Sequence, residues 1–441
     1  MMKKLMLFLC MILLIPAVKA AEPNPSVKYI QRTMKALEES TAENPARVRV
    51  LFYGQSIVAQ EWTKMVQQDL IAKYPTVKFT FQNNAIGGYT SERLVRTSES
   101  DLYPWYPDLL FFHVYGSTEK YEEIVRNVRQ RTTAEIVLWT SHLNAKQSVQ
   151  QMRDQRDQRS KEILAVADKY HCMVIDLNKK WCDLLHKNGW APGKLLQDSI
   201  HLTPKGCKYY AQFISEEIVR LPGTSGEESV SGSIRKIALS DPAVQKNADH
   251  SVSVKFKGNR ISAVSGPNWS KSANAKILLD GKDPAVFKDL WINTRTSCCP
   301  KWMPSIYSVR FNVPLIKEKW TLTALPDSAK DGKKIHYKVS GSITGSDGEG
   351  FSTEDFVSPS GRVVIPKGSF NTMFGYFKMD LPKDYKVVWQ SIPLFADPYY
   401  PGETGEPSVL IQNCSNEEHV LTIIPTGKID IEAFIVNTPA K

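Results

Sequence analysis

Apolar residues in the first half of the chain follow two spacings. Short runs rich in Val, Ile, Leu and Phe occupy residues 48–53, 77–82, 109–114, 136–139 and 173–176. Between them, residues 58–73, 120–131 and 149–168 mix apolar and polar positions as amphipathic helices do, and Pro204 opens a last helix to about residue 220. Strands that alternate with helices indicate a parallel sheet with helices on both faces, and ligands bind at the carboxyl ends of such strands.

The pattern changes after residue 222. Residues 223–232 are rich in Gly, Ser and Glu, which is typical of a linker. Beyond them, short β-rich runs are separated by Gly, Pro, Asp and Asn, at 251–256, 308–313, 320–324, 335–340, 362–365, 386–389 and 419–424. The sequence therefore predicts an α/β domain at 21–222, a linker at 223–232 and an all-β sandwich domain at 233–441.

The first 20 residues have the features of a secretion signal. Lys3 and Lys4 precede a short apolar run at 5–14, and the small residues Val18 and Ala20 suit a signal peptidase. We therefore expect an exported protein, periplasmic or secreted after cleavage, with no membrane span.

Composition and charge narrow the class of protein. The 441 residues are 42% hydrophobic and 23% charged, which excludes a disordered, collagenous or coiled-coil chain. The net charge is +10, and +7 once the three lysines of the signal are removed. This moderate excess suits an acidic polymer such as a polyuronic acid, or an ordinary solvated surface. No arginine-rich recognition element is present, so nucleic acid is disfavoured.

Six cysteines follow the signal, three on each side of residue 222. Because three cannot pair completely within one domain, at least one thiol in each domain is free or bridges the two. We expect one of Cys298 and Cys299 to pair with Cys414 and the other to be a buried thiol. The sequence holds no C-x-x-C pair and no H-E-x-x-H motif, so we expect neither a metal nor a cofactor.

Two short segments carry the residues of a nucleophilic triad. Ser56 follows the first predicted strand and precedes a helix, where local N–H groups stabilise developing negative charge. Asp198 and His201 lie three residues apart before the last helix, so the carboxylate can orient the imidazole as a general base for a serine. Taken singly, Ser56 also suits a helix N-cap, and Asp198 and His201 also suit a cap and a surface histidine. Val58 occupies the second glycine position of a G-x-S-x-G elbow, which excludes that motif.

A third segment, after the second predicted strand, contains Gly87 and Gly88. Paired glycines allow close backbone approach and can present an N–H to an oxyanion, although they also make ordinary loops.

Together and in this order, the three segments resemble the SGNH (GDSL-type) hydrolase superfamily over about residues 45–221. The resemblance places Ser56 at the nucleophile, with Gln55 in place of the usual Asp, and Gly88 at the oxyanion-hole glycine. Asp198 and His201 fall on the D-x-x-H pair, the most specific match. It implies a flavodoxin-like sheet and ester hydrolysis through an acyl-serine without a metal, with the Ser56 N–H as a further oxyanion donor.

One block departs from that family pattern. The usual Gly-x-Asn-Asp after the third strand is here Gly116, Ser117, Thr118 and Glu119, so Thr118 stands where the family has its oxyanion-hole Asn. His113, Tyr115, Ser117 and Thr118 are the candidates for a replacement donor.

The expected substrate follows from export, the β domain and the charge. An exported SGNH domain with a β-sandwich resembles carbohydrate esterases of plant cell-wall polysaccharides. Arg93 and Arg96 follow Gly88 and are candidates to bind a uronate carboxylate, or else form a solvated helix face. We expect a pectin methylesterase acting on an acidic, pectin-like polysaccharide, with polysaccharide O-acetylesterase as the close alternative. A non-catalytic carbohydrate-binding protein on a decayed esterase fold is the alternative of another class, which the retained triad disfavours.

C-terminal aromatic residues such as Trp302 suit either a sandwich core or a surface that stacks on sugar rings.

Overall fold

The structure, a computed structural model, describes residues 24–226, 229–270, 272–371 and 373–440. The predicted secretion signal lies outside the described residues. Within the described ranges, no helix is both long and apolar enough to cross a bilayer.

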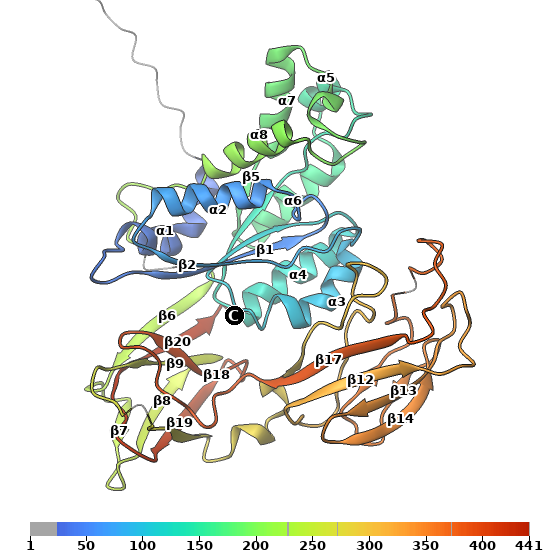
Figure 1. Cartoon of the computed structure of the whole chain (residues 1–441). Helices are drawn as coiled ribbons and strands as arrows, with labels where there is room; N and C mark the ends of the chain where they lie inside the picture. Colours follow the sequence, from blue (N-terminus) through green and yellow to red (C-terminus); the bar gives the residue numbers. More distant parts are fainter. Residues whose placement is uncertain (1–23, 227–228, 271, 372, 441) are drawn as a thin grey trace, which may run out of the picture.

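A parallel five-stranded sheet forms the centre of the N-terminal half (Figure 1). Its strands are β1 (Arg47–Gly54), β2 (Lys78–Asn83), β3 (Leu109–His113), β4 (Glu135–Trp139) and β5 (Met173–Ile175). The strand order β2-β1-β3-β4-β5 is that of flavodoxin-like folds. Every residue of β3 and β4 is buried, as expected for strands covered on both faces. The predicted α/β fold is confirmed.

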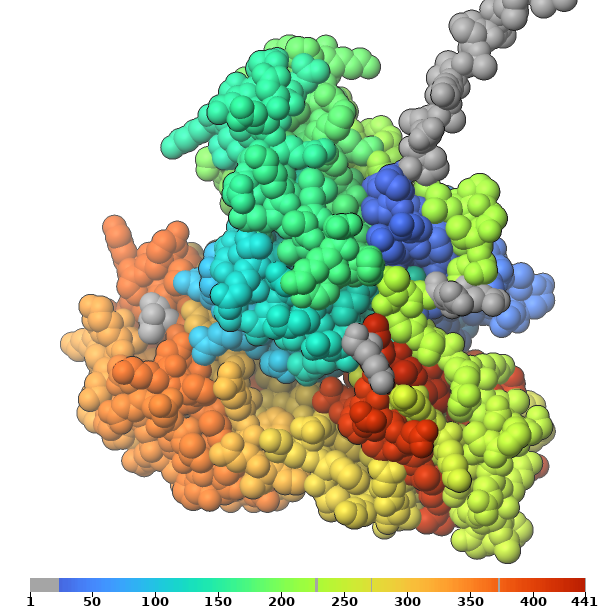
Figure 2. Space-filling model, turned by 180° about the vertical axis from the view of Figure 1, so that it is seen from behind, coloured from blue at the N-terminus to red at the C-terminus, as the bar shows by residue number. Residues whose placement is uncertain are grey.

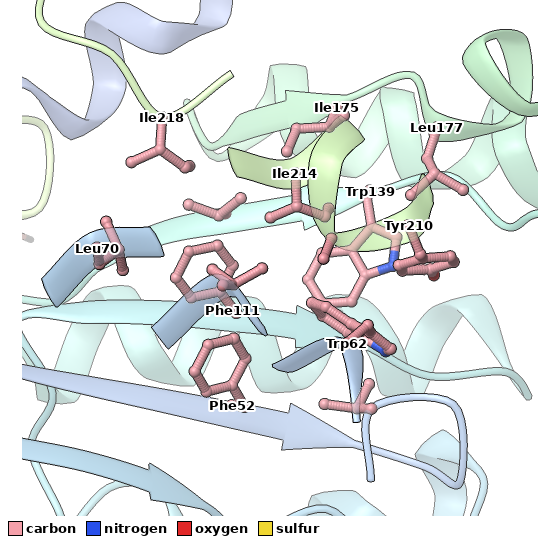
Figure 3. Close-up of a cluster of buried hydrophobic side chains, with 14 of the residues drawn as sticks. Phe52, Trp62, Leu70, Phe111, Trp139, Ile175, Leu177, Tyr210, Ile214 and Ile218 are labelled. Atoms are coloured by element: carbon pink, nitrogen blue, oxygen red, sulfur yellow. The ribbon is translucent and has the colours of Figure 1, made fainter. Parts of the chain in front are cut away.

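Helices cover both faces of this sheet. One face packs against η1 (Pro25–Ile30), α1 (Gln31–Glu38), α2 (Trp62–Lys73), α7 (Leu177–Asn188), η2 (Pro192–Leu195) and α8 (Pro204–Ser215). The other packs against α3 (Ser91–Asp101), α4 (Thr118–Arg131) and α6 (Gln158–Lys169). Figure 3 shows the first of these cores, where Trp62 and Tyr210 meet Trp139 of the sheet. The Trp139 Nε1–H donates to the Tyr210 hydroxyl at 2.7 Å, which satisfies the buried indole.

The helix predicted at 149–168 is two helices. α5 ends at Asp154 (Val149–Asp154), and α6 begins at Gln158. Asp157 accepts a hydrogen bond from the Ser160 N–H at 3.0 Å and so caps the second helix. The predicted single helix is therefore wrong, because an aspartate that could continue a helix instead starts a new one.

The C-terminal half contains two β units with separate cores. The sandwich unit (232–290 and 394–440) packs sheet β10-β19-β8-β7 on sheet β18-β9-β20-β6. The inserted unit (291–393) is built on sheet β11-β17-β12-β13-β14 with the small β15-β16 sheet. Its strands are β11 (Trp291–Asn293), β12 (Glu318–Ala324), β13 (His336–Gly341), β14 (Gly345–Phe351), β15 (Phe356–Val357), β16 (Val364–Ile365) and β17 (Lys386–Pro393). The predicted β-sandwich is confirmed, and the inserted unit is an additional finding.

The remaining elements belong to the sandwich unit. They are β6 (Gly232–Ala238), β7 (Val244–Lys246), β8 (Val252–Lys257), β9 (Arg260–Ser265), β10 (Ala275–Leu279), η3 (Pro284–Val286), η4 (Lys288–Leu290), β18 (Pro407–Gln412), β19 (Glu418–Pro425) and β20 (Ile431–Pro439). The strand predicted at 308–313 is wrong, because this loop of the inserted unit makes only an isolated bridge between Arg310 and Val364.

Both β units pack against the α/β domain. Figure 2 shows them as a continuous layer beneath it. In the sandwich unit, Asn259 accepts from the Tyr106 hydroxyl at 2.9 Å and donates to the Arg131 carbonyl at 2.8 Å. In the inserted unit, Arg295 pairs with Asp101 at the end of α3 at 2.6 Å. The inserted unit is thereby held beside α3.

The six cysteines that follow the predicted signal are all unpaired. Cys414 packs against the core of the sandwich unit and Cys299 against that of the inserted unit, while Cys298 is exposed. The predicted bridge to Cys414 is wrong, because these residues belong to different cores.

Candidate active site

Ser56 lies in the turn that follows β1. Gly54 ends the strand, and a Cβ at this position would collide with the carbonyl oxygen of His113, the last residue of β3. Glycine therefore allows the two strand ends to approach. The N–H groups of Val58 and Ala59 donate to the Gln55 carbonyl at 2.9 and 3.2 Å and close the turn. This geometry leaves Ser56 half-buried at the carboxyl end of the sheet.

The three residues predicted to form a triad lie in one hydrogen-bond chain. The Ser56 Oγ is 2.8 Å from His201 Nε2, and His201 Nδ1 is 2.7 Å from Asp198 Oδ2. With the carboxylate ionised, Nδ1 carries the proton and Nε2 accepts from the serine hydroxyl. This arrangement suits proton removal from Ser56 as its oxygen attacks a carbonyl carbon.

Asp198 is held in its charged form by backbone donors. The N–H groups of His201 and Ile200 donate to its Oδ1 at 2.7 and 2.8 Å. These backbone hydrogen bonds, more than the imidazole, lower the pKa of Asp198 to about 2. The side chain is half exposed and remains a carboxylate at all but strongly acidic pH.

Two side chains that the sequence analysis missed fix the loops of the triad. Gln60 exchanges two hydrogen bonds of 3.1 Å with the backbone of Leu202, which ties the serine turn to the histidine loop. His142, just after β4, donates its Nε2–H to the Ile200 carbonyl at 2.7 Å. Burial lowers the pKa of His142 to about 4, so it is a neutral donor. Its position after a strand end was a signal that pattern reasoning could have used.

Two backbone N–H groups are available for an oxyanion. Among the residues that the structure describes, neither the Ser56 N–H nor the Gly88 N–H has an acceptor. Gly88 has a φ of +77°, which favours glycine, and the neighbouring Gly87 lies against Ser56. These are the two N–H groups that the sequence analysis expected to bind an oxyanion, and that role stays a prediction.

The side chains that the sequence analysis named as possible further oxyanion donors make contacts elsewhere. The Thr118 hydroxyl donates to the Glu162 carboxylate and accepts from Arg159 at 3.3 Å. Ser117 caps α4. The expectation that Thr118 could complete the oxyanion hole is therefore not supported, because its single hydroxyl proton is already used.

His113 and Tyr115 pack against each other behind the serine turn. The His113 Nε2 is 3.0 Å from Ser141 Oγ, and the His113 and Tyr115 rings are nearly perpendicular at a centroid distance of 5.2 Å. Burial lowers the pKa of His113 well below its ordinary value, so its ring is neutral. Among the described residues, the Ser56 and Gly88 N–H groups thus remain the expected donors that have no acceptor.

The two arginines after Gly88 have different environments. Arg96 donates to the Gly368 carbonyl at 2.9 Å and to Ser369 at 2.7 Å, and its guanidinium lies over the Tyr307 ring. It is an interface residue, so the expectation that it binds a substrate carboxylate is corrected. Arg93 is partly exposed and donates weakly to the Gly88 carbonyl at 3.4 Å.

No protein-family model and no curated protein sequence matches the chain. Among solved structures, a two-domain esterase active on acetylated mannans is 12% identical, with 93% of this chain and 95% of that one covered and a TM-score of 0.36. An acetylxylan esterase from Geobacillus stearothermophilus is 20% identical, with 42% and 98% covered and a TM-score of 0.35. A Parabacteroides merdae protein described as a GDSL-like lipase is 16% identical, with 40% and 96% covered and a TM-score of 0.34. Each substrate named here is that of the solved protein. The roles assigned to residues of this chain depend only on the geometry of this chain.

Proposed function

We propose that this protein is a serine esterase that removes acyl groups from a polysaccharide. The observation that supports it is the hydrogen-bond chain Ser56–His201–Asp198, at 2.8 and 2.7 Å, at the carboxyl edge of a parallel sheet. A binding protein on a decayed fold would have no need to keep this spacing across two loops that are far apart in the sequence.

The reaction follows from these positions. His201 Nε2 takes the Ser56 proton while Oγ attacks the ester carbonyl carbon, and the Ser56 and Gly88 N–H groups stabilise the resulting oxyanion. His201 then gives the proton to the departing sugar oxygen, which leaves an acyl-Ser56. Water, deprotonated by His201, repeats the attack and releases the acid. Asp198 orients the imidazole and stabilises its charged form.

We favour an acetyl ester over a uronate methyl ester as the substrate. The pectin hypothesis depended on two arginines for a uronate carboxylate, and Arg96 is occupied by the inserted unit. Arg93 remains partly exposed beside Gly88, which keeps uronate methyl esters as the second candidate.

Product analysis separates the two candidates. Acetate release from acetylated xylan and glucomannan is compared with methanol release from methylated pectin, for the wild type and Ser56→Ala, with and without EDTA. We expect acetate release that Ser56→Ala abolishes and EDTA leaves unchanged. Methanol release alone would support the pectin hypothesis, and equal activity of Ser56→Ala would refute the serine mechanism.

A further inference from the structure

Trp302 of the inserted unit stands beside the candidate nucleophile. Its Nε1–H donates to the Gly87 carbonyl at 2.9 Å. The point where a Cβ on Gly87 would stand lies 3.0 Å from Trp302 Nε1 and 3.7 Å from the Ser56 Cβ. An indole from a separate β unit thus borders the space in which the ester must sit.

The loop that carries Trp302 (the bridging loop, residues 294–305) is held at both ends. Near its start, Arg295 pairs with buried Asp101 and donates to the Asn84 carbonyl at 2.9 Å. Near its end, Met303 is buried in a core of the α/β domain, and its Cε would be 2.7 Å from a Cβ on Gly88. Trp302 therefore stands between two fixed points.

Despite these anchors, Trp302 is 52% exposed. Phe377 packs edge-on against its ring at a centroid distance of 6.0 Å, and Tyr376, which contacts Phe377, is 76% exposed. The two aromatic residues belong to another loop of the inserted unit. A half-exposed indole on an anchored loop, next to further exposed aromatic surface, is unusual for a core residue and typical of a binding surface.

We propose that Trp302 is the platform on which a pyranose ring of the substrate chain stacks, so that the inserted unit completes the catalytic cleft. This inference rests on the proposed function. The C–H face of a pyranose ring packs on an indole face, and its hydroxyls stay in water. Such a contact holds the sugar that bears the ester while its acyl group faces Ser56 and the two N–H donors. It also gives a reason for the anchored bridging loop, because a mobile platform would lose binding free energy on ordering.

Kinetics on two esters test the platform. The substrates are acetylated xylooligosaccharides and ethyl acetate, which has no sugar ring. Trp302→Ala should lower kcat/KM on the oligosaccharide at least tenfold, mainly through KM, with a much smaller loss on ethyl acetate. Trp302→Phe keeps a ring but lacks the hydrogen bond to Gly87, and it should retain most activity on the oligosaccharide. Tyr400→Ala, which removes a 60% exposed ring of the sandwich unit, is the matched control.

Other results would overturn the proposal. Equal losses on both esters in both Trp302 variants would show that the residue only positions Gly87 and Gly88, and no loss on the oligosaccharide would exclude stacking. Calorimetric binding of the acetylated oligosaccharide to Ser56→Ala protein gives a readout without turnover. Binding that Trp302→Ala weakens supports the platform even if the esterase hypothesis fails, and the absence of binding overturns it.

Discussion

At the residue scale, the account depends on proton transfer through His201. Replacing His201 by Ala should lower kcat by about 10⁴-fold or more, since the serine loses its base. Asp198→Asn should be milder, because the amide changes the orientation of the imidazole but leaves it present. Steady-state kinetics on an acetylated oligosaccharide measure both. A loss of less than tenfold for His201→Ala would show that another group activates Ser56.

Asp198 also limits how the rate depends on pH. With its pKa lowered to about 2 by backbone hydrogen bonds, Asp198 stays ionised from neutral pH down to about pH 3. Asp198 should therefore add no step of its own to the rate profile above about pH 3. A kcat/KM profile from pH 4 to 9 checks this. Two separate steps on the acid side would contradict the assignment of Asp198 as a permanently charged partner.

Substituting Gly88 tests whether its N–H stabilises the oxyanion. An alanine here would have to adopt φ +77°, and its Cβ would press on Met303, so the N–H would move. Gly88→Ala should lower kcat by about 10²–10³, the cost of losing one such donor. Gly189→Ala is the matched control: its φ is +62°, and no atom lies within 4 Å of the added Cβ. Equal losses of kcat in the two variants would mean that the loss comes from backbone strain and not from the Gly88 N–H.

Short sequence motifs predicted which residues could form the triad and the glycine loop. They could not predict contacts between residues that lie far apart in the sequence. Ser56, Asp198, His201 and Gly88 stand in short local patterns that their chemistry requires. The partner of Trp302, Gly87, lies 215 positions away, and the Arg96 contact with Gly368 spans 272. The periodicity of a sequence carries no information about such pairs. For that reason Arg96 was interpreted as a cation available to a substrate carboxylate.

At the element scale, the sheet was easier to predict than the helices. The predicted strands match β1 to β5 within about one residue. Strands β1, β3, β4 and β5 are mostly buried apolar runs, whereas the edge strand β2 alternates half-buried Phe79 and Phe81 with exposed polar residues. Helix α3 was anticipated only as a possible helix face that carries Arg93 and Arg96, without bounds, since the positions it buries include Ser91, Thr97, Ser98 and Asp101. These polar residues face hydrogen-bond partners, not an apolar core, which hides the helical period.

His142, in the loop between β4 and α5, should make the free energy of unfolding depend on pH. The pKa of His142 is lowered to about 4 by burial, whereas an unfolded histidine titrates near pH 6.5. Between these values the unfolded chain binds a proton that the folded protein does not. The free energy of unfolding should therefore fall as the pH drops from about 6.5 to 4, by up to roughly 3 kcal/mol from this group.

His142→Gln tests this effect. The glutamine side chain can still donate to the Ile200 carbonyl but does not titrate. Thermal unfolding at pH 7, 5.5 and 4 should show a shallower decline in Tm for His142→Gln than for the wild type. Parallel declines would show that other groups, such as buried His113, set the acid sensitivity.

At the scale of the whole molecule, an ion pair between Arg295 and Asp101 links the inserted unit to the α/β domain. Asp101 is only 4% exposed, and Arg295 bonds to it at 2.8 and 2.6 Å. Arg295→Met would leave a buried carboxylate without its partner and should destabilise the protein by roughly 3 kcal/mol. Lys64→Met removes an exposed pair with Glu61 and should cost at most about 1 kcal/mol. Urea unfolding compares the two, and equal costs would mean that the interface pair contributes little.

The overall arrangement was only partly predictable. An α/β domain followed by β structure is visible in the change of pattern after residue 222. The division of the β half into two units was not, because β10 and β18 belong to one sandwich although more than a hundred residues separate them. Strands on either side of an insertion form one sandwich when their apolar faces pack together. A single sequence does not show which strands do so.

The most direct test of the central claim is the site of acylation. The wild type and His201→Ala are treated with an aryl phosphonate, and the adduct is mapped by mass spectrometry of peptides. The account predicts one adduct, on Ser56, with loss of esterase activity in step with labelling, and little or no adduct in His201→Ala. An adduct on another residue, or full activity in a protein labelled at Ser56, would contradict it.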